Sequence, residues 1–172
     1  MTPSPVDAAP SGLTTVTLPT ALGTFQALLS PTGVRELRFP NQALPTAPAA
    51  DPRAADLAAQ LDAFLGGRLR RFSLPLDLRG TPFQLQVWGA LREIPYGEVR
   101  SYAELAAAIG RPAAVRAVGA ANGANPLPVV VPCHRVIGAD GRLVGFGAGV
   151  EWKLRLLAIE NPARWGIMGQ PG

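Results

Sequence analysis

The sequence predicts an α+β fold in which a small N-terminal antiparallel sheet with one helix precedes a mainly helical C-terminal part. Two observations lead to this prediction. Short strand-like runs occupy residues 14–39, whereas helix-capping patterns dominate from residue 81 onward. The length of 172 residues also fits two small domains with a core that needs no disulfides. We therefore expect a flexible tail at 1–11, an N-terminal α/β domain at 12–80 and a C-terminal domain at 81–172.

The N-terminal part is expected to contain three strands and one helix. Residues 14–18, 24–29 and 34–39 have the composition of short strands, and the last run alternates apolar and charged side chains. A helix should follow Asp51-Pro52, which supplies an N-cap and a first-turn proline. Its apolar residues fall on one face, and a glycine pair ends it: Leu57, Leu61, Phe64 and Leu65, then Gly66-Gly67. Residues 68–77 are expected to form another extended segment.

The C-terminal part contains two capping boxes, and each of them predicts the start of a helix. They are Thr81-Pro82-Phe83-Gln84 and Ser101-Tyr102-Ala103-Glu104. A third helix is expected at 113–123. The second and third helices are joined by a tight glycine-containing turn, as in a helix-turn-helix, although most such helix pairs bind no DNA.

Charge and cysteine content limit the classes of function. There are 16 basic and 12 acidic residues, with the excess in the C-terminal half, so the net charge of +4 permits an anionic partner. A single cysteine excludes an intramolecular disulfide and favours a cytoplasmic location. One Cys and one His cannot form a closed zinc site, and we expect neither metal nor cofactor. No apolar run is long enough for a membrane helix.

Cys133 and His134 carry the strongest chemical signal, because the only cysteine and the only histidine of the chain are neighbours. A free thiol has a pKa of about 8.5 and needs a base or a positive neighbour to become reactive. His134 and Arg135 are available for this. Residues 127–132 are expected to be extended, and adjacent side chains then point in opposite directions, so that contact requires a turn or a bridging water. A buried structural cysteine is the alternative.

A reactive Cys–His pair also needs a group that orients the imidazole. Three carboxylates are candidates: Asp140, Glu151 and Glu160. Glu160 follows a predicted helix at 151–159, which Asn161-Pro162 should end. The alternative is an ordinary solvated acid at a helix end.

Together the motifs resemble those of the O6-alkylguanine-DNA alkyltransferases, or methylated-DNA–protein-cysteine methyltransferases. The resemblance spans about residues 81–160 with the spacing intact. It implies a ribonuclease H-like N-terminal domain and a winged-helix or helix-turn-helix C-terminal domain. The motifs that carry it are Pro132-Cys133-His134-Arg135-Val136-Ile137-Gly138, Val87-Trp88, Ile94-Pro95-Tyr96-Gly97, Ser101-Tyr102, Arg116-Ala117-Val118-Gly119, Asn125-Pro126 and Leu156-Leu157-Ala158-Ile159-Glu160.

This resemblance implies direct-reversal DNA repair by a monomer. Cys133 would take the alkyl group from O6-alkylguanine, and from O4-alkylthymine, in a base flipped out of duplex DNA. Each molecule would react once, because no second cysteine can remove the group. His134 would act through a water as the base, and Glu160 would hold the imidazole. Tyr102 would protonate the leaving oxygen, with Lys153 close to the site.

The resemblance also assigns residues to DNA and to the substrate. Arg116 would fill the gap left by the flipped base, and Tyr102 would turn the 3′ phosphate. Asn125 would tie the recognition helix, which lies in the minor groove, to the active-site strand. At Phe146 the family usually has tyrosine, so a hydroxyl is lost. The remaining DNA contacts are assigned to Ala117, Gly119 and Arg135, and the substrate pocket to Trp88, Pro128, Val144, Gly145, Phe146 and Gly147.

Two other functions fit part of the pattern. An alkyltransferase-like protein would flip the lesion without transfer, but it would have another residue in place of Cys133. A winged-helix transcription regulator would bind an operator sequence and would keep the cysteine as a structural residue.

Overall fold

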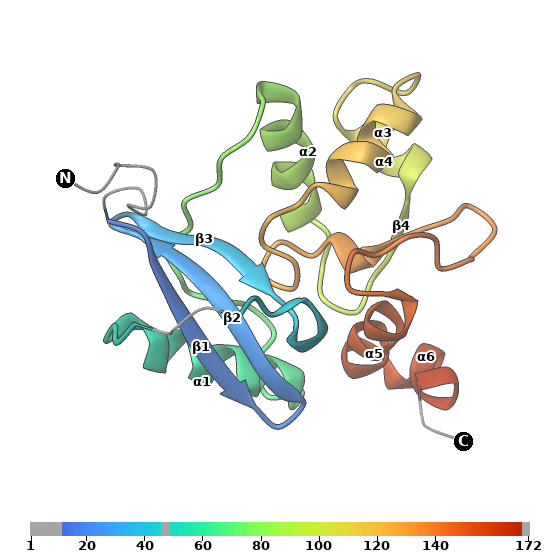
Figure 1. Cartoon of the computed structure of the whole chain (residues 1–172). Helices are drawn as coiled ribbons and strands as arrows, with labels where there is room; N and C mark the ends of the chain where they lie inside the picture. Colours follow the sequence, from blue (N-terminus) through green and yellow to red (C-terminus); the bar gives the residue numbers. More distant parts are fainter. Residues whose placement is uncertain (1–11, 46–48, 170–172) are drawn as a thin grey trace.

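The computed structural model describes residues 12–45 and 49–169, so the predicted tail at 1–11 lies outside the described residues. The N-terminal part forms an antiparallel three-stranded sheet in the order β1-β2-β3 (Figure 1). The strands are β1 (Thr14–Thr20), β2 (Gly23–Ser30) and β3 (Gly33–Arg38). All three predicted strands are therefore confirmed, and they bury one apolar row that includes Val16, Leu18 and Phe25.

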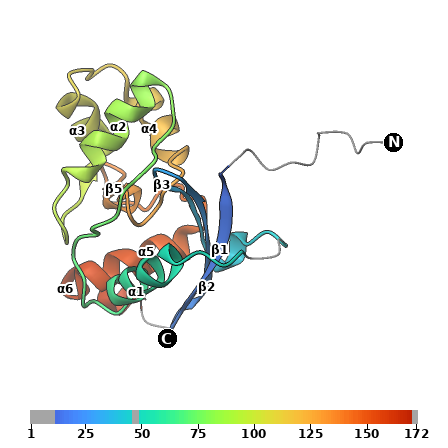
Figure 2. The same ribbon diagram turned by 90° about the vertical axis from the view of Figure 1, so that its left-hand side faces the viewer.

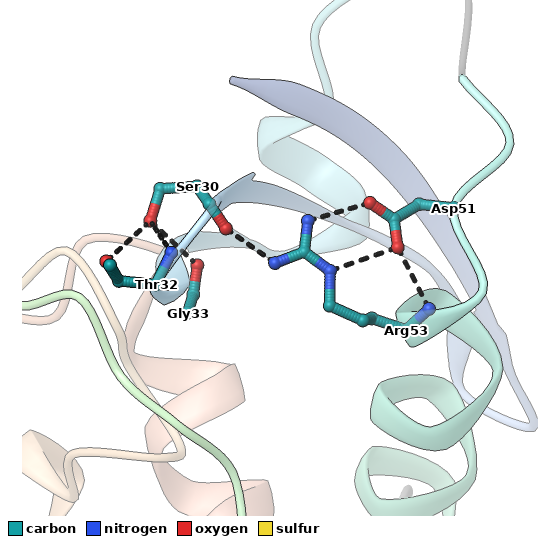
Figure 3. Close-up of polar contacts among 5 residues, drawn as sticks. All are labelled: Ser30, Thr32, Gly33, Asp51 and Arg53. Atoms are coloured by element: carbon teal, nitrogen blue, oxygen red, sulfur yellow. Dashed lines mark hydrogen bonds and ion pairs between the residues drawn. The ribbon is translucent and has the colours of Figure 1, made fainter. Parts of the chain in front are cut away.

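Helix α1 (Arg53–Leu65) packs against this sheet through the predicted apolar face, which is buried. Its N-cap position is held by Pro52 rather than Asp51. Asp51 instead accepts hydrogen bonds from the backbone N–H and the guanidinium of Arg53, and this guanidinium also donates to the carbonyl of Ser30 (Figure 3). The contact with Arg53 lowers the pKa of Asp51 to about 2. The start of α1 is thereby tied to the end of β2.

The predicted extended segment at 68–77 forms no regular strand. It meets the sheet at a single parallel bridge between Val34 and Leu76. Val34 N–H donates to the Pro75 carbonyl at 2.9 Å, and Asp77 N–H donates to the Val34 carbonyl at 2.9 Å. Pro75 has no N–H to contribute to a longer ladder, which explains why the pairing stops.

Three helices form the next layer (Figures 1 and 2): α2 (Pro82–Arg92), α3 (Tyr102–Ala108) and α4 (Val115–Gly123). Both predicted capping boxes are confirmed. The hydroxyl of Thr81 accepts from Gln84 N–H at 3.1 Å, and the hydroxyl of Ser101 accepts from Glu104 N–H at 3.1 Å. A short parallel pair, β4 (Arg100–Ser101) and β5 (Val136–Ile137), connects the start of α3 to the segment after the cysteine.

The segment that delivers the cysteine is a turn, so the prediction of an extended segment at 127–132 is wrong. Val131 N–H donates to the Leu127 carbonyl at 2.8 Å, and Val129 has φ +75°. The side chain of Asn125 spans this turn: its amide donates to the Val131 carbonyl at 2.9 Å and accepts from Leu127 N–H at 2.9 Å. These bonds compensate for a backbone conformation that a β-branched residue rarely adopts.

Two helices complete the described chain, α5 (Val150–Glu160) and α6 (Pro162–Gly169). Helix α5 ends at the predicted place, but α6 is not anticipated by the pattern. Pro162 occupies the first turn of the new helix, where its missing N–H costs nothing. The side chain of Asn161 accepts from Arg164 N–H at 3.2 Å. The same Asn-Pro pair thus ends one helix and starts the next.

Buried side chains from both halves of the chain form one continuous core. It reaches from Val16 on β1 to Leu156 on α5 and includes Cys133. The site near Cys133 is therefore built on the packing of both halves. None of the helices in the described ranges has the length and apolar character needed to cross a membrane.

Candidate active site

Cys133 lines an open cavity of about 980 Å³. Cys133 is 5% exposed, and its thiol reaches solvent through this cavity. The walls come from the end of β3, from α4 and the turn that follows it, and from the loop after β5. This last segment, residues 144–149, is called the substrate loop below. Among the predicted pocket residues, those that line the cavity are Pro128, Val144, Gly145, Phe146 and Gly147.

His134 and Glu160 meet beneath this cavity. Cys133–Arg135 form a single turn of 3₁₀ helix, and Glu160 is the last residue of α5. Nε2 of His134 lies 3.2 Å from Oε2 of Glu160, and both side chains are fully buried. Neither Nδ1 nor Nε2 of His134 makes a hydrogen bond to any described residue, so Nε2 lies close to the carboxylate without hydrogen-bond geometry. Of the three candidate carboxylates, Glu160 is the one brought to the imidazole, while Asp140 and Glu151 are exposed.

The electrostatics of this pair favour a neutral imidazole beside a carboxylate. Burial lowers the pKa of His134, and this effect exceeds the opposite effect of Glu160. Burial alone would raise the pKa of Glu160, but the contacts with His134 and Arg135 hold the pKa below its usual range. A neutral imidazole near pH 7 can accept a proton.

The thiol itself is not activated at rest. Burial raises the pKa of Cys133, while the Asn125 amide and the positive charge of Lys153 act in the opposite direction without overcoming it. Cys133 is therefore a neutral thiol at pH 7, and its use as a nucleophile requires a base.

Tyr102 and Lys153 converge on one backbone oxygen at the entrance of the site. The Tyr102 hydroxyl donates to the Val144 carbonyl at 3.1 Å, and Nζ of Lys153 donates to the same oxygen at 3.2 Å. Burial lowers the pKa of Lys153 to about 8. The predicted proximity of Lys153 to the cysteine agrees with the influence of its charge on Cys133.

Helix α4 carries the residues predicted to contact DNA, and Gly119 is the one of them on this helix that lines the cavity. Arg116 and Ala117 are exposed, and Gly119 lies against the ring of Tyr102. Gly119 and Asn125 line the cavity, and Asn125 bonds to the active-site turn as described above. Tyr102, α4 and Cys133 therefore share one concave surface.

Two predicted positions are wrong. Arg135 is 7% exposed rather than available to DNA, because its guanidinium binds the carboxylate of Glu160 and donates to the Ile94 carbonyl at 2.7 Å. Trp88 is 2% exposed and outside the cavity, because its indole N–H donates to the Ala121 carbonyl at 2.8 Å. Arg135 thus anchors Glu160, and Trp88 fixes α2 to α4.

Sequence reasoning missed the contribution of the N-terminal half to the cavity. The end of β3 and the following short helix η2 (Pro40–Gln42) line one side of it. No chemical motif marks this segment, which reads as an ordinary strand end followed by a proline turn. The residues concerned are Glu36, Leu37, Arg38, Phe39 and Gln42.

Comparison with known proteins places this site in a family. Residues 82–162 match the model described as 6-O-methylguanine DNA methyltransferase, DNA binding domain. A methylated-DNA–protein-cysteine methyltransferase of Mycolicibacterium paratuberculosis is 58% identical over 112 residues, which are 64% of this chain and 68% of the relative. The constitutive enzyme of that name from Bacillus subtilis is 56% identical over 111 residues, 64% of this chain and 67% of the relative.

Solved structures agree with these relatives. The crystal structure of Mycobacterium tuberculosis OGT in complex with DNA matches with a TM-score of 0.78 and 45% identity, covering 86% of this chain and 92% of that one. An O6-methylguanine methyltransferase structure from the same organism has a TM-score of 0.78 and 44% identity, with 87% and 93% covered. The chain therefore belongs to the methylated-DNA–protein-cysteine methyltransferase family.

Proposed function

We propose that this protein repairs duplex DNA by transferring the alkyl group of O6-alkylguanine, and of O4-alkylthymine, to its own Cys133. The observation that carries the proposal is a lone cysteine that lines an open cavity and is followed in the chain by His134, which is buried against Glu160. A purely structural cysteine would not need a cavity or a buried base. A transcription regulator with a structural cysteine leaves the cavity and the base unexplained, and an alkyltransferase-like protein would have another residue in place of Cys133.

The chemical step is an in-line displacement. Sγ of Cys133 forms a bond to the alkyl carbon, and the bond from that carbon to O6 of guanine breaks. We place the proton of the neutral imidazole on Nε2, which lies 3.2 Å from Glu160, so that Nδ1 holds a free lone pair and takes the thiol proton through a water. Tyr102 supplies one proton to the leaving oxygen and regains one through solvent, into which the protonated His134 releases the former thiol proton. The O6–H tautomer then moves its proton to N1, and guanine is restored.

Access to the lesion requires base flipping, because the sulfur cannot reach a paired base inside the helix. We assign α3 and α4 to a helix-turn-helix unit within a winged-helix-like domain, with α4 in the minor groove and Arg116 in the vacated stack. The small residues of α4, such as Ala117 and Gly119, permit a close approach. We assign the sheet with α1 to a ribonuclease H-like domain that ends near residue 80.

The reaction is expected to occur once per molecule. A thioether does not exchange under mild conditions, and the chain has no second cysteine that could remove the group. The protein is then a stoichiometric reagent that acts as a monomer, without a cofactor, in the cytoplasm.

Recovery of guanine in the DNA tests this function. A duplex with one O6-methylguanine, in excess over protein, is incubated, digested and separated by chromatography. The expected result is one restored guanine per protein molecule and then no further conversion. The Cys133→Ala variant should restore none while still binding the lesion duplex. Continued conversion by the native protein, or conversion by the variant, would contradict the proposal.

A further inference from the structure

The substrate loop has one internal backbone hydrogen bond, from Gly149 N–H to the Phe146 carbonyl at 2.8 Å, and is otherwise rich in glycine. It contains Gly145, Gly147 and Gly149 within six residues, and Gly145 and Gly149 have φ of +53° and +105°. Glycine-rich backbone populates many conformations, so the position of this loop depends on what holds it. Its first residue, Val144, is held through its carbonyl by Tyr102 and Lys153.

The other end of the loop is held by the N-terminal half of the chain. The side-chain amide of Asn41, in η2, donates to the Ala148 carbonyl at 2.8 Å across 107 residues of sequence. The ring of Phe39 lies edge-on to Phe146 with a centroid distance of 5.6 Å and also packs on Trp152 of α5 at 4.9 Å. Phe39 is 1% exposed, which makes it a fixed support.

The same segment fixes the opposite wall. Leu37 N–H donates to the Pro126 carbonyl at 2.9 Å, at the start of the turn that carries Pro128 and leads to Cys133. The segment from Leu37 to Asn41 therefore bonds to both walls of the cavity. Both walls line the same cavity as Cys133.

We propose that Asn41 and Phe39 are positioning residues that set which alkyl groups fit beside Cys133, by holding the substrate loop close to the Pro128 wall. The proposal rests on the alkyl transfer described above and adds its selectivity. Without the Asn41 contact the loop opens more often, and a bulky benzyl group gains access relative to methyl. Phe39 lies in the core and its replacement would disturb folding, so Asn41 is the residue to test.

Two measurements on the full-length protein test the role of Asn41. Asn41→Ala removes the side-chain amide that donates to the Ala148 carbonyl. Asn41→Asp also removes the N–H donor but keeps a side chain of nearly the same size and shape. The matched control is Gln60→Ala, because Gln60 also joins its side-chain amide to a distant backbone, at Ser73, but lies outside the cavity lining. All three variants should have similar melting temperatures.

The first measurement is hydrogen exchange of the peptide that contains the substrate loop. Both Asn41 variants should exchange about two- to tenfold faster there, which is the change in local opening expected for one lost hydrogen bond. Gln60→Ala should match the native protein. Unchanged exchange in both Asn41 variants would overturn the proposal, whatever the protein does to DNA.

The second measurement is the ratio of transfer rate constants for O6-benzylguanine and O6-methylguanine in the same duplex. The ratio should rise at least about twofold in both Asn41 variants and stay constant in Gln60→Ala. Faster exchange with an unchanged ratio would overturn the selectivity role. If the native protein transfers neither group, the proposed function itself fails, and the role in selectivity fails with it.

Discussion

The reacting cysteine and its neighbours combine a neutral thiol with buried charges. Glu160 accepts from Arg135 and faces His134, so one carboxylate serves both an arginine and an imidazole. Removal of Arg135 would leave this buried carboxylate without its main partner. Arg135 therefore holds the carboxylate that faces His134, and it is not exposed for contact with DNA.

Lys153 is a positive charge that burial in this site disfavours. It is fully buried, and burial lowers its pKa from 10.5 to about 8. At pH 7 the lysine is protonated in both the folded and the unfolded chain, so the folded state bears the full penalty. Between pH 8 and 10.5 the unfolded chain binds more protons, and native stability therefore gains as the pH rises.

The variant Lys153→Met removes this penalty. Its melting temperature should exceed that of the native protein at pH 7, and the difference should shrink by pH 10. Transfer should be slower, because the positive charge near Cys133 is lost. Thermal unfolding at both pH values and a transfer assay check this. An equal difference in melting temperature at both pH values would contradict the lowered pKa.

At the scale of elements, the turn from Leu127 to Val131 places the thiol. Val129 holds φ +75° while 1% exposed, a conformation that costs of order 1–3 kcal/mol for such a residue. Glycine adopts this conformation without strain, although it usually destabilises relative to alanine. At position 129 we therefore expect a glycine variant to be no less stable than an alanine variant.

Urea unfolding of Val129→Gly and Val129→Ala tests this strain. Both variants lose buried methyl groups, and both should be less stable than the native protein. The glycine variant should be at least as stable as the alanine variant. If the glycine variant were less stable than the alanine variant by about 1 kcal/mol, which is the ordinary difference between these residues, the turn would not be strained at Val129.

Helix α4 is the element assigned to DNA. Arg116 is exposed on it and makes no ion pair with a residue in the described ranges. Arg116→Ala should weaken binding to a lesion duplex and slow transfer, because the gap left by the flipped base is no longer filled. Arg71→Ala is the matched control, since Arg71 is likewise exposed and makes no ion pair with a described residue. Equal losses in both variants would leave only a charge effect and contradict the role of Arg116.

The elements differ in how well the sequence predicts them. Capping boxes at Thr81 and Ser101 locate two helices correctly, because capping depends on residues three positions apart. The turn at Val129 is not predictable in this way. Its conformation is imposed by Asn125 and by the packing of the surrounding core, and apolar residues between prolines otherwise favour extended backbone.

For the whole molecule, the shared core explains which part of the site the sequence reveals. Cys133, His134 and Glu160 follow from residue types and from the resemblance to a family. The buried position of Arg135 and the wall formed by β3 and η2 do not, because they depend on contacts between distant segments, such as Leu37 with Pro126. Long-range packing leaves no local pattern in the sequence.

The central claim is that Cys133 accepts one alkyl group and keeps it. Intact-mass spectrometry after incubation with excess O6-methylguanine duplex tests it most directly, followed by peptide mapping. The expected result is complete conversion to a species with one added methyl group, located on Cys133, with no further change over time. Unmodified protein, a methyl group on another residue, or more than one methyl group would contradict the account.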